Sequence, residues 1–169
     1  GLWRSRGAGA TWKKVESFAI KGLGEPTPPI RKHAGLSLVV IDPTGKHIFV
    51  GSSDPGEQHL FRSDDAGETW HAVGGAPASK LLPLKAQLDA HQNLYITYGN
   101  SIGPNGITDG AVWKLDTTAS VWTDITPDKS PDRAAGGYCG ISVSDDGQTL
   151  AVATLDRWHG VDTVWRHGK

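Results

Sequence analysis

The stretch HLFRSDDAGETWHAV, residues 59–73, contains the pattern that decides the fold: an aromatic residue, a cation, a polar turn, and a tryptophan nine residues after the aromatic. The same pattern recurs in GLWRSRGAGATWKKV at 1–15 and in AVWKLDTTASVWTDI at 111–125, and another copy begins at Trp165. The leading aromatics stand at positions 3, 61, 113 and 165, so the period is 58, then 52, then 52 residues. A period of this size is typical of a propeller, a solenoid or an array built from one supersecondary unit.

Each period also contains two short apolar runs that are rich in β-branched residues and separated by a turn. The runs are Leu36–Ile41 with Ile48–Val50, Leu84–Leu88 with Leu94–Ile96, and Ile141–Val143 with Leu150–Val152. With the two strands of the aromatic hairpin they make four short antiparallel strands, which is one propeller blade. No stretch of ten residues keeps an apolar stripe at helical spacing. We therefore predict an all-β fold, a partial β-propeller of four-stranded antiparallel blades.

The length of the chain limits how much of a propeller it can form. Closed propellers typically contain about four to eight blades, whereas 169 residues supply about three. The blades and blade remnants lie at approximately 1–15, 35–73, 84–125 and 139–169. We therefore expect residues 1–169 to be a fragment of one propeller domain that packs against the remainder of its own propeller.

The turn SDDAGETW, Ser63–Trp70, has the Ser-x-Asp-x-Gly-x-Thr-Trp form known as an Asp box. Ser63 and Asp65 can accept backbone N–H groups of the turn, Gly67 permits a positive φ, and Trp70 can bury its ring beneath the hairpin. We interpret this turn as a folding device on the outside of a blade rather than as a catalytic or ligand-binding site.

The other copies of the turn are less complete. The first keeps the serine, glycine, threonine and tryptophan but carries Gly7 where the aspartate belongs, and the copy before Trp122 is degenerate. The cations that follow the leading aromatics recur in phase, which indicates a role at the blade edge; they are Arg4, Arg62, Lys114 and Arg166.

Composition argues against several classes of partner. The net charge is −1 and charges of both signs are interspersed, so we expect neither nucleic acid nor a membrane as a partner. The seven histidines show no metal-ligand spacing, and we predict no metal and no cofactor. The single cysteine, Cys139, lies in a strand-like segment and is interpreted as a buried core residue rather than a nucleophile.

The connections between the second and third strands of the blades leave the same end of their strands. In a propeller they would cluster on one face, where ligand grooves usually lie. The longest runs from Tyr98 to Asp109, and another contains Trp158. A polar, glycine-rich loop beside an exposed tryptophan suits a sugar, because the indole offers a flat apolar surface and polar side chains bind hydroxyls. Packing of Trp158 on a neighbouring blade is the alternative.

These segments resemble a known family. SDDAGETW, the run from YITYG to TDGAVWK, and GGYCGISVSDDGQTLAVATLDRW are together similar to the N-terminal propeller of glycoside hydrolase family 74, the xyloglucan-specific endoglucanases. The resemblance covers nearly the whole chain, and the second and third segments are more specific than the turn. It implies a seven-bladed ring, of which this chain forms about three blades, facing a second propeller domain across an open cleft.

The resemblance also implies an activity, which is inverting cleavage of the β-1,4-glucan backbone of xyloglucan by a secreted enzyme, extracellular or periplasmic. Inversion requires two carboxyl groups about 6.5–9.5 Å apart. In the family these come from an early blade of the first propeller and from the second propeller, so no catalytic residue is assigned here. Asp109 lies on the expected face, as do three other loop aspartates, Asp54, Asp156 and Asp162.

Substrate-binding residues are assigned from the same resemblance. Family members carry adjacent tryptophans that stack on sugars; Trp158 matches the first, whereas His159 stands in place of the second. Tyr98, Asn100 and Asp109 are further candidates from the preceding loop. The function that competes with a polysaccharide hydrolase is a non-catalytic propeller that binds carbohydrate or protein.

Overall fold

A computed structural model describes residues 1–18, 35–53, 59–75, 81–101, 107–127 and 137–154. These residues form twelve β-strands and no helix, so they contain no helical segment that is long and apolar enough to cross a membrane. The predicted all-β class is confirmed.

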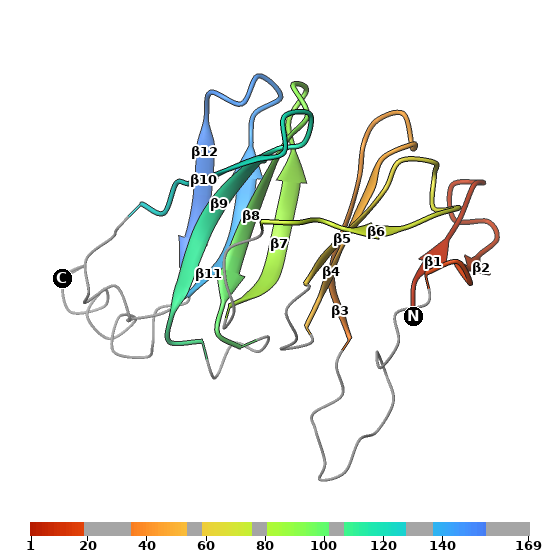
Figure 1. The fold of residues 1–169 in the computed structure, drawn as a ribbon, viewed down its shortest axis with the longest axis horizontal. Helices are drawn as coiled ribbons and strands as arrows, with labels where there is room; N and C mark the ends of the chain where they lie inside the picture. Colours follow the sequence, from red (N-terminus) through yellow and green to blue (C-terminus); the bar gives the residue numbers. More distant parts are fainter. Residues whose placement is uncertain (19–34, 54–58, 76–80, 102–106, 128–136, 155–169) are drawn as a thin grey trace, which may run out of the picture.

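The strands form four antiparallel sheets that follow one another along the chain (Figure 1). The first hairpin is β1 (Trp3–Arg4) with β2 (Lys13–Lys14). The next sheet has the order β3 (Leu36–Ile41), β4 (Ile48–Ser52), β5 (Leu60–Ser63), β6 (His71–Ala72). The third has the order β7 (Leu82–Leu88), β8 (Asn93–Gly99), β9 (Gly110–Asp116), β10 (Val121–Asp124), and the last pairs β11 (Tyr138–Val143) with β12 (Leu150–Thr154).

Both complete sheets are four-stranded meanders, as the repeat predicts. Each predicted apolar run coincides with a strand or lies within one. Alternation explains the pairing: in β8, Leu94, Ile96 and Tyr98 point to one face, whereas Tyr95 and Thr97 point to the other. All of them are buried, because a neighbouring sheet covers each face.

The core lies between the sheets rather than within any one of them. One cluster joins the two four-stranded sheets; its buried members are Leu38, Phe49, Leu60, Leu94, Ile96, Tyr98, Ala111 and Leu115. A second cluster joins the first hairpin to the next sheet through Leu2, Val15, Ile48 and Val50. Strand β4 is buried throughout, since Phe49 contributes to one cluster and its neighbours to the other. Each sheet therefore depends on the next for the burial of its apolar face.

The repeated tryptophans are less buried than the sequence suggests. Trp3 and Trp12 are 56% and 59% exposed, and Trp70 is half-buried. The ring of Trp70 packs edge-on against Phe18, with 4.7 Å between centroids, and its Nε1 donates to the Gly67 carbonyl. Trp122 Nε1 donates to the Gly74 carbonyl at 3.0 Å. The indole nitrogens of Trp70 and Trp122 thus both donate to backbone carbonyl groups, those of Gly67 and Gly74.

Cys139 lies in β11, as expected for a strand residue, but its side chain is half-buried rather than buried. Its position explains the difference, because β11 is paired only with β12 among the described residues. The Cys139 Sγ lies 3.7 Å from the carbonyl oxygen of Ala153 on that strand.

Candidate functional site

The two ends of the sheets differ in how the chain connects there. At one end, short turns join consecutive strands; they are 5–12, 42–47, 64–70, 89–92, 117–120 and 144–149. We call this the turn end. At the other, the chain leaves the strands at Ser52, Gly99 and Thr154, and we call this the loop end. The strand register therefore places at one end of the sheets the strand ends from which the connections that the sequence assigns to ligand binding begin.

Neighbouring sheets approach each other closely at glycines of the loop end. A Cβ atom added to Gly51 would lie 3.0 Å from the Cγ of Pro83, which joins the second sheet to the third. A Cβ atom added to Gly110 would lie 2.9 Å from the Cα of Gly137, at the start of the last sheet. Only glycine allows so close an approach at these positions.

Asn100 closes the loop that follows β8. Its Nδ2 donates to Thr108 Oγ1 at 2.7 Å, and its Oδ1 accepts the N–H groups of Thr108 and Asp109 at 2.9 and 3.3 Å. The backbone N–H of Asn100 donates to the Asp109 carbonyl at 3.1 Å. The amide of Asn100 is thus engaged within the loop, and it fixes the backbone that carries Asp109.

Asp109 is exposed, and its two carboxylate oxygens differ in their hydrogen bonds. Its Oδ1 accepts the Gly110 N–H at 2.8 Å, whereas Oδ2 makes no hydrogen bond with the described residues. The carbonyl oxygen of Asp109 would lie 2.7 Å from a Cβ atom on Gly137, so the residue sits against the last sheet. A carboxylate held in this way can accept a hydrogen bond from a hydroxyl group of a ligand.

Tyr98 is fully buried in the core between the two four-stranded sheets. Its ring offers no exposed face to a sugar, because it shares one face of β8 with Leu94 and Ile96. Its hydroxyl makes no hydrogen bond with the described residues, and burial raises the pKa of the phenol. The structure thus gives Tyr98 a packing position, which the alternation of apolar residues along β8 could have indicated.

Trp158 and His159 lie outside the described residues, as do Asp54, Asp156 and Asp162. The chain that leads to Trp158 leaves β12 at Thr154, which pairs with Tyr138 at the loop end. Tyr138 N in turn would lie 2.9 Å from a Cβ atom on Gly110. The start of that segment is therefore next to the loop that carries Asp109.

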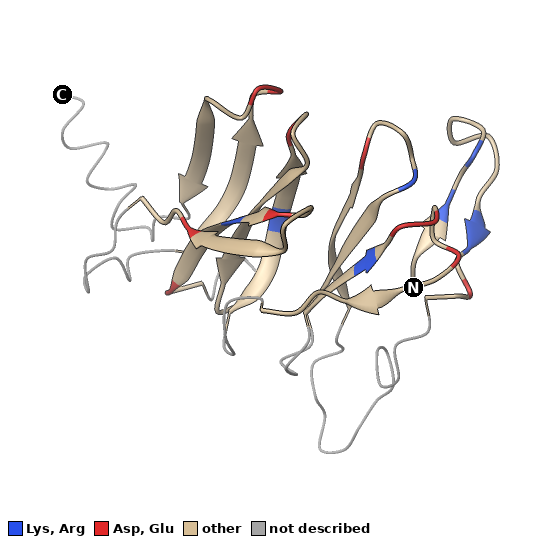
Figure 2. Cartoon of the chain, turned by 45° about the horizontal axis from the view of Figure 1, so that its top comes forward, with Lys and Arg blue, Asp and Glu red and all other residues tan. Residues whose placement is uncertain are grey.

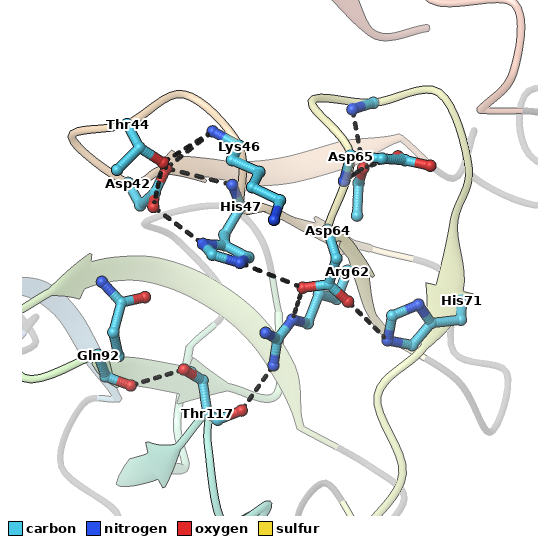
Figure 3. A network of polar contacts seen from close by, with 12 residues as sticks. Asp42, Thr44, Lys46, His47, Arg62, Asp64, Asp65, His71, Gln92 and Thr117 are labelled. Carbon is cyan, nitrogen blue, oxygen red and sulfur yellow. Dashed lines mark hydrogen bonds and ion pairs between the residues drawn. The ribbon is translucent and has the colours of Figure 1, made fainter.

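The turn end contains a network of ionisable groups whose partners are internal (Figure 3). Asp42 is buried, and it accepts hydrogen bonds from the hydroxyl of Thr44 and the N–H groups of Lys46 and His47. Burial of Asp42 opposes its ionisation, but the hydrogen bonds from His47 and Thr44 outweigh this effect and hold its pKa below the usual range.

The same network connects two sheets. Arg62 donates from Nε to Asp64 at 2.6 Å and from Nη1 to the carbonyl of Thr117 in the next sheet at 2.6 Å. Both ring nitrogens of His47 face carboxylates, with Nε2 3.7 Å from Asp64 Oδ1. No group of three or more His, Cys, Asp or Glu in the described part of the chain is arranged to hold a metal ion. These contacts support the fold.

Arg4 makes the equivalent contact one sheet earlier, since it donates to the carbonyl of Ala66 and faces Glu68 at 3.3 Å. Two in-phase cations of the repeat thus bind a turn of the following sheet. The phase in the sequence indicates an edge position, but the acceptor could not be identified before the sheets were placed.

No protein-family model matches the chain. The chain is 41% identical over 172 residues to a xyloglucanase of a Paenibacillus species and 38% identical over 172 residues to a xyloglucanase of Hypocrea jecorina. Each match covers 94% of this chain and 16% or 20% of the relative, so the chain spans about one fifth or less of their length.

A solved structure gives the same result in three dimensions. The GH74 xyloglucanase of Xanthomonas campestris superposes with a TM-score of 0.74 at 31% identity, over 91% of this chain and 23% of that one. The fold and these likenesses define the class, which is that of glycoside hydrolases built from β-propellers. Within it, the chain is a segment of a glycoside hydrolase family 74 protein, and the predicted family is confirmed.

Proposed function

We propose that this chain is part of the substrate-binding half of a secreted xyloglucanase that cleaves the β-1,4-glucan backbone with inversion. The observation that carries the proposal is the similarity to xyloglucanases along almost the entire chain. The substrate is then a polysaccharide, xyloglucan or a related β-glucan, and a second propeller domain faces this one.

The loop end is the surface that we assign to the substrate. Among the described residues Oδ2 of Asp109 has no hydrogen-bond donor, so it can accept a hydrogen bond from a sugar hydroxyl, and Asn100 holds the backbone of Asp109. We assign Trp158 as a stacking platform, because an indole covers the apolar face of a pyranose, with His159 beside it as a polar contact. Asn100 acts through Asp109 rather than on the sugar, since its own amide is engaged with Thr108 and Asp109.

Hydrolysis itself requires a carboxylic acid that protonates the leaving oxygen and a carboxylate that activates water. We place both in parts of the protein other than this chain. The contribution of this segment is positioning: it binds glucosyl units on one side of the scissile bond, which lowers the entropic cost of reaching the reactive geometry.

The test uses the intact polypeptide that contains this chain. Purified protein is assayed on xyloglucan and on an unsubstituted β-glucan, and NMR of the first product anomer determines inversion. Trp158→Ala is expected to raise the KM for xyloglucan at least several-fold. Trp12→Ala, an exposed tryptophan of the first hairpin, is the matched control and should leave KM unchanged.

Two results would contradict the proposal. Equal kinetics of the Trp158→Ala and wild-type proteins would exclude this binding site. Xyloglucan binding without cleavage by the intact protein would instead favour the alternative, a non-catalytic carbohydrate-binding propeller.

A further inference from the structure

The turn Ser5–Trp12, here called the Ser5 turn, has the backbone of the Ser63 turn, Ser63–Trp70, although it lacks the aspartate. Ala8 and Gly9 have φ values of 49° and 87°, and their counterparts Ala66 and Gly67 have 58° and 89°. The serine hydroxyl accepts the glycine N–H at 2.9 Å in the Ser5 turn and at 2.8 Å in the Ser63 turn. The donors of the two turns therefore point in equivalent directions.

In the Ser63 turn these donors converge on the carboxylate of Asp65. It accepts Thr69 Oγ1 at 2.6 Å, Thr69 N at 2.8 Å and Glu68 N at 3.0 Å. The hydrogen bonds from Thr69 are the main reason that the pKa of Asp65 falls from 3.8 to about 2. The turn is thus a site built for one carboxylate group.

In the Ser5 turn the matching residue is Gly7, which has no side chain to fill that site. Thr11, the counterpart of Thr69, makes no hydrogen bond with the described residues through its N–H or its hydroxyl. A pocket of about 390 Å³ lies here instead, lined by Arg4, Arg6, Gly7, Thr11 and Lys13.

The charge around this pocket is mainly positive. Arg4 and Arg6 share the single carboxylate of Glu68, at 3.3 and 3.4 Å, and Lys13 forms no ion pair with the described residues. The neighbouring Lys14 is paired with Glu16. Figure 2 shows the basic residues of this first hairpin together, near the N-terminus. Among the described residues, three cations thus line the pocket and one carboxylate, Glu68, contacts two of them, which leaves an excess of positive charge there.

We propose that this pocket binds a carboxylate anion in the position that Asp65 occupies in the Ser63 turn. One oxygen accepts the N–H of Thr11 and the other accepts its hydroxyl, as Oδ1 and Oδ2 of Asp65 do with Thr69, and the charge is balanced by Arg6 and Lys13. Charge-assisted hydrogen bonds of this kind are stronger than neutral ones. The site lies on the first hairpin, away from the loop end, and the proposal does not depend on the xyloglucanase assignment.

Two sources present this chemistry: a free carboxylate ion, and the carboxylate of an acidic sugar residue. Formate, as the smallest carboxylate, and glucuronate are therefore the probes, with glucose as the neutral control for the sugar. An effect of glucuronate at lower concentration than formate assigns the site to acidic sugars, and the reverse order assigns it to free ions.

The measurement is thermal unfolding of the intact polypeptide at constant ionic strength, with chloride replaced stepwise by formate. A ligand that binds only the folded state raises the Tm in a saturable manner. Gly7→Asp supplies the carboxylate within the chain, and a Cβ atom at Gly7 meets only Ala10 Cβ, at 3.9 Å. This variant is expected to have a higher Tm than wild type and no formate-specific increase.

Thr11→Val and Thr69→Val form a matched pair that keeps the test valid should Gly7→Asp fail to fold. Thr11→Val should weaken the apparent formate affinity about tenfold, the equivalent of one lost charge-assisted hydrogen bond. Thr69→Val removes the same hydroxyl from the Ser63 turn and should lower the Tm while keeping the formate response. The proposal is overturned if formate has no effect beyond chloride, if sulfate acts equally well, or if Thr11→Val responds like wild type.

Discussion

The turn end and the loop end of these sheets use polar residues in opposite ways. At the turn end, the carboxylates of Asp42, Asp65 and Asp89 each accept several hydrogen bonds from their own turn. At the loop end, one carboxylate oxygen of Asp109 makes no hydrogen bond with the described residues, and the sheets meet at glycines. The turn end stabilises the repeat, and the loop end is the part that has groups left for a ligand.

The largest effect is expected where the sheets touch at the loop end. In Gly110→Ala the new methyl group would lie 2.5 Å from the carbonyl oxygen of Tyr98 and 2.9 Å from Gly137 Cα, both of them backbone atoms. We expect a loss of roughly 3 kcal/mol in the free energy of unfolding, measured by chemical denaturation of the intact protein.

Gly74→Ala is the control for this prediction, because an added Cβ would have no neighbour within 4 Å. Its effect should be within about 0.5 kcal/mol of wild type. Equal losses in the two variants would show that close packing at the loop end is not what joins the sheets.

The next effect distinguishes the two serine turns. Ser63 is fully buried, and Ser63→Ala leaves the Gly67 N–H without an acceptor, which we expect to cost about 1–2 kcal/mol in unfolding free energy. Ser5→Ala removes the equivalent bond to Gly9, but water can replace it because Gly9 is exposed. Denaturation curves should therefore show a larger loss of unfolding free energy in Ser63→Ala than in Ser5→Ala. The opposite order would contradict the distinction between the buried and the exposed serine turn.

A smaller effect is expected from the asparagines at opposite ends of β8. Asn100→Ala should raise the KM for xyloglucan about threefold with kcat unchanged, because Asp109 loses its support but the reacting groups are untouched. Asn93→Ala breaks a hydrogen bond to Asp89 at the turn end and should leave KM unchanged. A KM that rises equally in both variants would assign Asn100 a general structural role.

The smallest effect concerns acid sensitivity at the turn end. The pKa of Asp65 is about 2 in the folded protein, whereas an aspartate outside the fold has a pKa of 3.8. Ionised Asp65 therefore contributes stability above about pH 4. That contribution is lost as the pH falls from 3.8 towards 2, because a protonated carboxyl accepts the turn hydrogen bonds less well. In Asp65→Asn, the decline of the Tm over this range should be shallower than in wild type. If the Tm of the two proteins declined in parallel with pH, the acid sensitivity would not come from Asp65.

The strands could be predicted because local residues determine them. Leu36–Ile41 was predicted with its observed bounds, and Leu94–Ile96 lies within β8, which pairing with both neighbours extends to Gly99. The hydrogen bonds of Ser63 and the positive φ of Gly67 likewise follow from one short motif. Such features depend on contacts within a few residues along the chain.

The loop end was harder to predict, because its contacts join distant parts of the chain. Tyr98 was interpreted from its loop, although its place in the alternation with Leu94 and Ile96 assigns it to the core. The closure of the loop by Asn100 spans eight residues and has no sequence signal of its own. Gly110 and Gly137 come from different sheets, and their contact follows only from the packing of those sheets.

The contacts of Arg4 and Arg62 run in one direction, each from a sheet to the turn of the next. The β3–β6 sheet therefore supplies one donor to the sheet after it and receives one from the hairpin before it, so the described sheets have a polarity like that of a head-to-tail polymer. Duplication or loss of one whole period, counted from one leading aromatic to the next, preserves this contact at each new junction. An insertion of any other length does not, and whole periods are therefore the unit by which such a protein can change its number of sheets.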